Sequence, residues 1–434
     1  MQTTIESLGQ LERRLTMAVP SAEIEQQVDE RLKRLARTMK MHGFRPGKVP
    51  MRIVAQQYGP QVRSEVIGAE IDKAFSEVVR NENLRVAGYP RIEPKGGSAD
   101  GQLEFSATFE VYPEVAIGDL SQTSIQRLAL DVGDAEVEKT IEVLRKQRRR
   151  FNTAERGAQI GDRVFIDFTG SIDGAEFPGG KGSDVAMLLG EGRMLPDFES
   201  NLVGLAADAT KRFEVKFPDD YGAKEVAGKA ATFEVSVKKV EEPELPAIDA
   251  DFARALGVND GDVARMRAEV RANVEREVKK RLGDDVKQKA MQALLDATKL
   301  ELPKSLVEME VQRLVAGARA NLQARGLKTE NVPIDPALFE PQARRRVALG
   351  LAIGELVKSK GLGATPEQVR ALVEEHAATY EQPTEVVNWL YSQSDRVSEF
   401  EALALEQNVV QWVLGQVKVS EQSVAFDDLM GKSA

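Results

Sequence analysis

The chain has 434 residues, of which 42% are hydrophobic and 29% are charged, and its formal net charge is −10. This composition is typical of folded globular domains, and the length predicts roughly two to four of them. The negative charge argues against a protein whose whole surface binds nucleic acid. Cysteine is absent and the two histidines, His42 and His376, are far apart, so we expect no disulfide, no metal site and no catalytic triad.

The sequence shows no sign of export or membrane insertion. The segment Met1–Glu6 is not a basic region followed by an apolar run, as a secretory signal would be. No stretch approaches the roughly 18 apolar residues that cross a bilayer. We therefore expect a cytoplasmic, soluble protein without membrane contacts.

Residues 1–115 combine strand and helix patterns. Apolar residues alternate in the segments 11–19 and 103–111, as expected for strands with one buried face. Ser21 is expected to cap a helix after the first strand. The apolar positions of that helix are Ile24, Val28, Leu32, Leu35 and Met39. We expect an α+β domain with a helix-loop-helix insertion between strands.

Residues 116–150 are expected to form a linker and a helix. Helical spacing runs from Asp134 to Arg150, and the segment ends in a basic run at 145–150. A basic run can contact nucleic acid, but cations also complement the negative end of the helix dipole. We favour the second explanation.

Residues 151–243 are assigned to an antiparallel β domain with one short helix. Apolar alternation defines several strands, and Asp173–Gly174 predicts a hairpin turn. Pro196 and Gly204 are expected to bound the helix. The acidic, proline-containing segment 241–246 is interpreted as a linker.

Residues 244–434 are assigned to an all-α domain with extended arms. Apolar residues from Val263 to Leu294 recur almost every four positions, and four residues turn a helix by about 400°. The apolar stripe must therefore wind around the helix, as expected for an arm that presents apolar surface in several directions. The alternative is a helix broken near Gly283 with two ordinary faces. Further along, Thr365–Gln368 predicts a capping box.

The segment 43–50 predicts a stiff loop directly after the first helix. Two glycines and two prolines in eight residues oppose both helix and strand, and the loop carries one aromatic ring and two cations. These groups suit an apolar pocket and an anionic partner, and residues 1–50 have a local net charge of +3. The glycine spacing and Val49 after the lysine exclude a nucleotide-binding P-loop. A surface turn with Phe44 packed inward is the alternative.

This loop resembles the signature of the trigger factor family. Every specified position is matched, by Gly43, Phe44, Arg45, Gly47, Lys48 and Pro50. The resemblance implies that the loop docks on the large ribosomal subunit beside the polypeptide exit tunnel. Phe44, Arg45 and Lys48 would contact a ribosomal protein and nearby rRNA. It also implies that the C-terminal arms hold nascent or unfolded polypeptides, and that free molecules can form homodimers.

The segment 161–240 resembles the FKBP family of peptidyl-prolyl isomerases. The matching stretches are Val164–Gly170, Asp173–Phe177, Leu188–Gly190, Met194–Phe198, Phe217–Gly222 and Ala231–Val235. The resemblance implies a catalytic pocket whose wall is formed by Phe168, Phe177, Met194, Leu195, Phe198 and Phe233. Tyr221 would supply a hydroxyl, and Tyr221 and Phe198 are expected at the rim. The alternative is that the aromatic residues only fill a small core.

The residue types suit isomerisation of a prolyl bond. Rotation about the amide costs about 18–20 kcal/mol because resonance is lost, and the twisted amide is less polar than the planar one. An apolar pocket with one hydrogen-bond donor favours the twisted form and needs no nucleophile, metal or cofactor. Pro178 stands where many family members have Asp, while Phe168 and Phe198 replace the common Tyr and Trp. We predict that activity is retained but that macrolide inhibitors of the family bind poorly.

The combined prediction is a ribosome-associated chaperone that isomerises peptidyl-prolyl bonds. One rival is a free cytoplasmic isomerase whose flanking regions only dimerise it, and it would be fully functional without residues 1–115. A second rival is an RNA-binding protein that uses the basic run at 145–150. It would bind naked RNA with a strong salt dependence.

Overall fold

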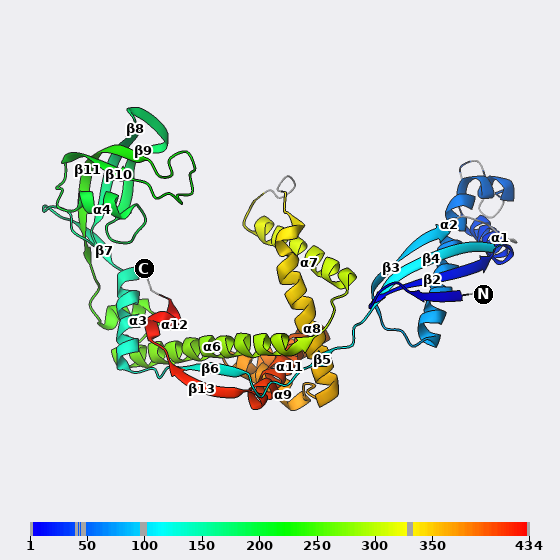
Figure 1. The fold of residues 1–434 in the computed structure, drawn as a ribbon. Coiled ribbons are helices and arrows are strands. Elements are labelled where there is room, and N and C mark those ends of the chain that lie inside the picture. The colour runs from blue at the N-terminus through cyan, green and yellow to red at the C-terminus, as the bar shows by residue number, and fades with distance from the viewer. Residues whose placement is uncertain are drawn as a thin grey trace. The chain divides into compact units, whose positions relative to one another are not determined.

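The computed structural model describes residues 3–39, 42, 44, 49–95, 102–327 and 333–431 (Figure 1). The chain forms two compact units. The first contains Met1–Ile125 and Lys287–Val419, and the second contains Gln126–Val286 and Ser420–Ala434. Among the described residues, none of the helices combines the length and apolar character that crossing a bilayer requires.

An antiparallel sheet opens the first unit. Its strand order is β1 (Thr3–Ser7), β2 (Glu12–Pro20), β4 (Gln102–Val111) and β3 (Val86–Lys95). The two strands predicted from alternation are therefore confirmed as β2 and β4, which pair with each other. Their inward residues Leu15, Met17 and Ala107 are completely buried.

Two helices cover this sheet and confirm the predicted α+β insertion. They are α1 (Ser21–Thr38) and α2 (Met51–Asn81), which pack against each other and share one core with the sheet. The predicted cap at Ser21 is wrong. Ser21 is already the first helical residue, and Pro20 precedes it without a side-chain cap, because β2 runs directly into the helix.

The rest of the first unit is helical. Its helices are α7 (Lys304–Ala324), α8 (Glu340–Lys360), α9 (Pro366–Ala377), α10 (Pro383–Tyr391) and α11 (Ser394–Gln416), with a 3₁₀ turn at Pro336–Phe339 and a short β5–β12 pair (Ala116–Ile117, Thr298–Lys299). The capping box at Thr365 is confirmed. Gln368 N–H donates to the Thr365 hydroxyl at 3.3 Å, and Thr365 N–H donates to the Gln368 side chain at 3.0 Å.

One carboxylate of the sheet caps the first turn of α7. Glu110, near the end of β4, accepts from the backbone N–H groups of Lys304 at 3.0 Å and Ser305 at 2.7 Å. The hydroxyl of Ser305 in turn donates to the Ala87 carbonyl at 2.8 Å. A carboxylate at this end also complements the positive end of the helix dipole.

The second unit contains a five-stranded antiparallel sheet. Its order is β10 (Thr210–Lys216), β11 (Ala230–Glu244), β8 (Arg163–Ile172) and β9 (Ala175–Leu188), and β7 (Arg150–Thr153) pairs with the far end of β11. The hairpin turn is confirmed, because Asp173 and Gly174 both have left-handed φ values, 51° and 85°. The short helix is confirmed as α4 (Pro196–Leu202).

Two boundaries differ from the prediction in this unit. The predicted linker at 241–246 begins instead after Glu244, because β11 continues through Glu244 to pair with β7. Glu241 is consequently buried, and it accepts from Arg163 Nε at 2.6 Å. The helix predicted to reach Arg150 is α3 (Asp134–Gln147), since Arg150 already belongs to β7.

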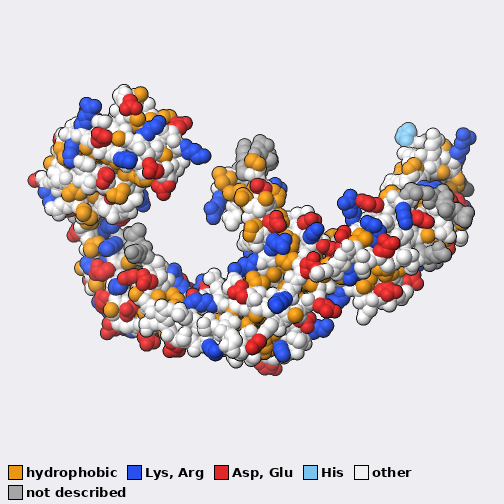
Figure 2. Space-filling view, viewed as in Figure 1, with side chains coloured by type: hydrophobic (Ala, Val, Ile, Leu, Met, Phe, Trp, Pro, Cys, Tyr) orange, Lys and Arg blue, Asp and Glu red, His pale blue; other side chains and the backbone are white. Residues whose placement is uncertain are grey.

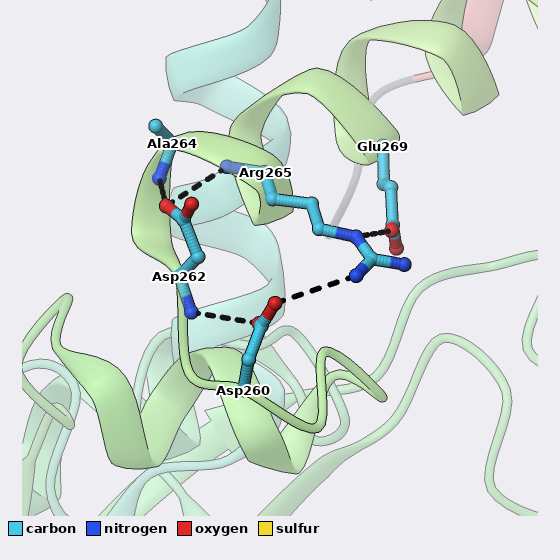
Figure 3. A network of polar contacts seen from close by, with 5 residues as sticks. All are labelled: Asp260, Asp262, Ala264, Arg265 and Glu269. Carbon is cyan, nitrogen blue, oxygen red and sulfur yellow. Dashed lines mark hydrogen bonds and ion pairs between the residues drawn. The ribbon is translucent and has the colours of Figure 1, made fainter.

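A helical layer completes the second unit. It consists of α3, α5 (Ala250–Ala255), the first part of α6 (Val263–Ala297) and α12 (Phe426–Met430), together with most of the paired strands β6 (Ser124–Ala129) and β13 (Lys418–Ser423). Asp262 caps α6 by accepting from the N–H groups of Ala264 at 2.8 Å and Arg265 at 3.2 Å (Figure 3). Asp260 accepts from Asp262 N–H, and this bond holds the pKa of Asp260 below its ordinary value.

The long helix α6 corrects both expectations for its apolar stripe. It is continuous over 35 residues, so the break near Gly283 is wrong. The stripe does wind, but it is not presented as open surface. Val270 and Val274 are buried with α3 and α5, whereas Ala290 and Leu294 are buried in a separate core with α8 and α11. A winding stripe suits a helix that contributes to two different cores in succession.

Candidate functional site

Four of the predicted phenylalanines form one cluster on the second unit's sheet. Phe233, on β11, lies at its centre, and its ring centroid is 5.2 Å from Phe198, 6.2 Å from Phe177 and 6.3 Å from Phe168. The Phe198 and Phe177 rings meet Phe233 edge-on, an arrangement that aromatic pairs prefer. β8, β9, β11 and α4 therefore bring together residues that span more than 60 positions of sequence.

The other three predicted residues lie beside this cluster. Met194 and Leu195, just before α4, are partly buried and pack against it. The Tyr221 ring contacts Phe217 at a centroid distance of 4.8 Å and is 40% exposed, as a rim residue should be. The expected rim position of Phe198 is wrong, because only 4% of this residue is exposed. Phe198 lies in the interior of the cluster, since α4 turns its ring inward onto Phe233.

Sequence reasoning missed two phenylalanines of the cluster. Phe213 lies 5.4 Å from Phe198, and Phe217 lies 6.0 Å from Phe177. Both alternate along β10 and its extension, so the period-2 pattern placed them inside the domain without showing which rings they meet.

Glycines of the strands make room for the rings, and they were also missed. A Cβ atom on Gly170 would lie 2.6 Å from the Phe233 ring, and one on Gly182 would lie 2.5 Å from the Phe168 ring. Real Cβ contacts are longer than this, so the rings lie directly on the backbone. A glycine inside a strand pattern is the signal that could have indicated such a close approach.

A buried carboxylate holds the loop that carries Met194 and Leu195. Glu199 of α4 is 7% exposed and accepts from the N–H groups of Gly190 at 2.8 Å and Met194 at 3.2 Å. Glu199 therefore lies near the cluster because it accepts hydrogen bonds from the backbone of this loop. A charged residue within a short amphipathic helix gave no sequence signal for this role.

The carboxylate of the residue that precedes Phe168 on β8 is also fully engaged. Asp167, next to Phe168, accepts from Asp184 N–H at 2.7 Å, from Lys238 at 3.0 Å and from the Ser183 hydroxyl at 2.9 Å. The backbone bond from Asp184, then Lys238 and Ser183, hold the pKa of Asp167 below its ordinary value. The site therefore offers apolar surface and a phenol rather than a poised acid or base.

Only part of the predicted docking loop falls within the described residues. Gly43, Arg45, Gly47 and Lys48 lie outside them. Phe44 is 38% exposed, in contrast to the inward packing of the alternative interpretation. At the end of the loop, Val49 is buried in the domain core and Pro50 immediately precedes α2.

The basic run at 145–150 is largely occupied by contacts within its own unit. Arg145 donates to the Pro246 carbonyl at 2.8 Å, and Arg148 donates to the Ala255 carbonyl at 3.3 Å. Arg149 pairs with Glu191 at 2.5 Å. Cations engaged in this way make a weak surface for RNA, which disfavours the RNA-binding interpretation.

Comparison with known proteins covers the whole chain. The family model "Bacterial trigger factor protein (TF)" matches residues 1–144, and its C-terminal counterpart matches residues 262–415. The model "FKBP-type peptidyl-prolyl cis-trans isomerase" matches residues 154–238.

Several relatives match from end to end. The proteins called "Trigger factor" in Aromatoleum aromaticum, Azoarcus sp. and Nitrosospira multiformis are 57%, 55% and 54% identical, each with 100% of both chains covered. With its aromatic cluster inside the FKBP-type isomerase domain, the chain belongs to the bacterial trigger factor family of chaperones.

Proposed function

We propose that the protein docks on the large ribosomal subunit, binds nascent polypeptides at the exit tunnel, prevents their premature folding and aggregation, and isomerises their prolyl bonds. Residues 1–115 would dock, 116–150 connect, 151–243 isomerise and 244–434 bind substrate, all in the cytoplasm. The observation that carries this proposal is the complete signature loop 43–50, with an exposed Phe44, in a chain that matches trigger factors from end to end.

The docking loop is chemically suited to a surface of protein and RNA. Phe44 is available to enter an apolar pocket, while Arg45 and Lys48 supply charges for phosphates. Val49, at the C-terminal end of the loop, is buried in the domain core, so this end of the loop is fixed to the domain. No cofactor or metal is needed for this interaction.

The isomerase site acts by stabilising the twisted amide. Met194, Leu195 and the edges of Phe168 and Phe177 would enclose the prolyl ring, above a floor made by Phe198 and Phe233. The exposed Tyr221 would donate its hydroxyl to a substrate carbonyl. Because the twisted amide is less polar than the planar one, exclusion of water on the apolar side lowers its relative free energy.

The helices α7 and α8 provide a surface for unfolded chains. A cavity of about 410 Å³ lies there, and it is lined mainly by Tyr112, Leu306, Met309, Val347 and Leu351. Met309 is 44% exposed, and hydrophobic side chains reach the surface of this unit between charged ones (Figure 2). Apolar contacts are non-directional, so such a surface accepts segments of many sequences.

Ribosome co-sedimentation tests the docking proposal. The test variant is Phe44→Ala/Arg45→Ala/Lys48→Ala in the full chain. Its matched control is Tyr89→Ala/Arg91→Ala/Lys95→Ala, which also removes one ring and two cations, from exposed positions of β3 in the same domain. We expect only the first variant to lose co-sedimentation, with unchanged circular dichroism for both.

Two results would overturn this assignment. If the wild type stays in the supernatant at moderate salt, the free isomerase becomes the better account of the chain. If both variants pellet like the wild type, docking does not use this loop. Sedimentation velocity of the free protein would show whether unbound molecules form the homodimers that we also propose.

A further inference from the structure

We propose that Arg149 is a positioning residue for the isomerase site, acting through Glu191 on the loop 190–195. This inference rests on the proposed assignment of Met194 and Leu195 to the pocket wall. It gives one residue of the basic run at 145–150 a role that differs from both the dipole and the RNA explanations.

The loop 190–195 has little regular structure of its own. It connects β9 to α4, and both Gly190 and Gly192 adopt left-handed backbone conformations, with φ values of 91° and 68°. Such a segment depends on side chains from elsewhere to fix its course. Glu199 provides one attachment from the α4 side, through the N–H groups of Gly190 and Met194.

Arg149 provides a second attachment, from outside the FKBP-like segment. Its guanidinium donates to the Glu191 carboxylate at 2.5 Å, and the two side chains are only 20% and 29% exposed. An ion pair that is partly shielded from water is stronger than an open surface pair. The Arg149 guanidinium also lies 5.4 Å from the Phe151 ring centroid, and Phe151 is fixed because β7 pairs with β11.

This attachment bears directly on the pocket wall. Met194 and Leu195 lie three and four positions after Glu191, in the same connection. Displacements of about 1 Å at a site can lower rates substantially, so a loosened loop should weaken the fit to the twisted prolyl bond. Arg145 and Arg148 do not share this role, because their guanidinium groups donate to the carbonyls of Pro246 and Ala255. Arg193 also pairs with Glu191, at 3.9 Å, but it belongs to the same loop and so does not attach the loop to another element.

The test measures kcat/KM for isomerisation of a short prolyl peptide by the full chain. We expect Arg149→Ala and Glu191→Ala each to lower kcat/KM by about threefold to tenfold. The exchanged pair Arg149→Glu/Glu191→Arg should recover most of this loss. Arg148→Ala removes a neighbouring cation whose bond lies elsewhere, and it should match the wild type.

A salt titration separates positioning from a general effect on stability. Because the pair is partly shielded from water, about 1 M NaCl should reduce the wild-type rate only part of the way toward that of Arg149→Ala, and should change that variant much less. The urea midpoint of the domain should move little in any of these variants. If the two single variants lose activity only in proportion to lost folded protein, Arg149 has a merely structural role and the inference fails.

Leu195→Ser distinguishes failure of this inference from failure of the site assignment. If Leu195→Ser retains wild-type kcat/KM, the proposed pocket wall is wrong and the inference falls with it. If Leu195→Ser is impaired while Arg149→Ala and Glu191→Ala equal the wild type, the pocket stands and the positioning role is refuted.

Discussion

The isomerase domain and the α7–α8 surface use hydrophobic residues in opposite ways. In the isomerase domain, rings of Phe198 and Phe233 are buried against one another at fixed edge-on angles. On α7 and next to α8, Met309 and Leu338 are 44% and 77% exposed. The first arrangement holds rings in fixed positions, whereas the second leaves flexible side chains free to adapt.

This difference fits the two tasks that we propose. Stabilising one twisted amide requires preorganised atoms, since only interactions stronger in the transition state raise the rate. Holding unfolded segments requires contacts that tolerate any sequence, which aliphatic and Met side chains provide. The two tasks should therefore respond differently to substitution.

Phe233→Ala should have the largest effect, because this ring contacts the rest of the cluster. Large-to-small substitution of a buried Phe costs about 3–5 kcal/mol, and isomerase activity should disappear. Hydrogen exchange of amides in β8 and β11 would measure the lost stability within the full chain. At temperatures where the isomerase domain of this variant is still folded, the full chain should still suppress client aggregation through the proposed α7–α8 surface. Loss of this suppression would contradict our proposal that isomerisation and holding use separate surfaces.

Gly182→Ala should destabilise the same domain by about 1–3 kcal/mol, as overpacking does. The new methyl group would lie 2.5 Å from the Phe168 ring and 2.8 Å from Val185. Gly222→Ala is the control, since no heavy atom beyond the glycine and its two chain neighbours lies within 4 Å of the position that its methyl group would occupy. Urea unfolding monitored at the domain, together with the isomerase rate, should separate the two variants; equal behaviour would show that the backbone there relaxes freely.

Asp162 should make the isomerase domain sensitive to acid. Burial alone would raise its pKa, but hydrogen bonds from Arg156 at 2.5 Å and from Gln159 N–H at 2.8 Å outweigh burial and lower it. A carboxylate whose pKa is lower in the folded state stabilises the fold at pH values above its unfolded pKa of about 3.9. This stabilisation is lost as the pH falls through the pKa of the folded state.

The corresponding measurement is the unfolding free energy of the domain at several pH values. The wild type should lose stability below about pH 4, and Asp162→Asn should be less stable at pH 7 with a shallower acid slope. Asp208→Asn is a control carboxylate in a loop of the same domain. Parallel acid slopes for wild type and Asp162→Asn would show that this ion pair does not control the transition.

Met309→Ser should have the smallest effect on stability, within about 0.5 kcal/mol, because the side chain is half exposed. It should nevertheless weaken suppression of client aggregation, whereas Met309→Leu should preserve it. Light scattering by an unfolded client would show the difference. Indistinguishable scattering for the two variants would remove the cavity beside α7 from the proposed holding surface.

The sequence predicted the elements in which apolar residues follow one clear period or a turn has a characteristic residue pair. Alternation located β2 and β4, and the Asp173–Gly174 turn located the β8–β9 hairpin. Predicted boundaries were wrong where tertiary contacts extend an element: β11 continues into the predicted linker, as far as Glu244, because β7 pairs with it. The prediction for the apolar stripe of α6 was wrong for a similar reason. The spacing of the stripe does not show that two different cores cover it.

The candidate site was predictable by residue type but not by geometry. The resemblance to FKBP proteins indicated four phenylalanines of the cluster and the three residues beside it. The burial of Phe198 and the contributions of Phe213 and Phe217 depend on packing between separate elements. Glu199 contacts the loop 190–195 through backbone N–H groups, and Arg149 contacts it through an ion pair with a residue 42 positions away. No local sequence pattern encodes either contact.

We propose that one rigid site isomerises prolyl bonds while a separate, open surface holds unfolded chains. The most direct test measures prolyl isomerisation and client aggregation in the same preparations of the full chain. The two variants are Leu195→Ser/Tyr221→Ala and Met309→Glu/Leu351→Glu. Our account predicts that the first loses isomerisation but still suppresses aggregation, and that the second does the reverse. Joint loss of both activities in either variant, with the chain still folded, would contradict it.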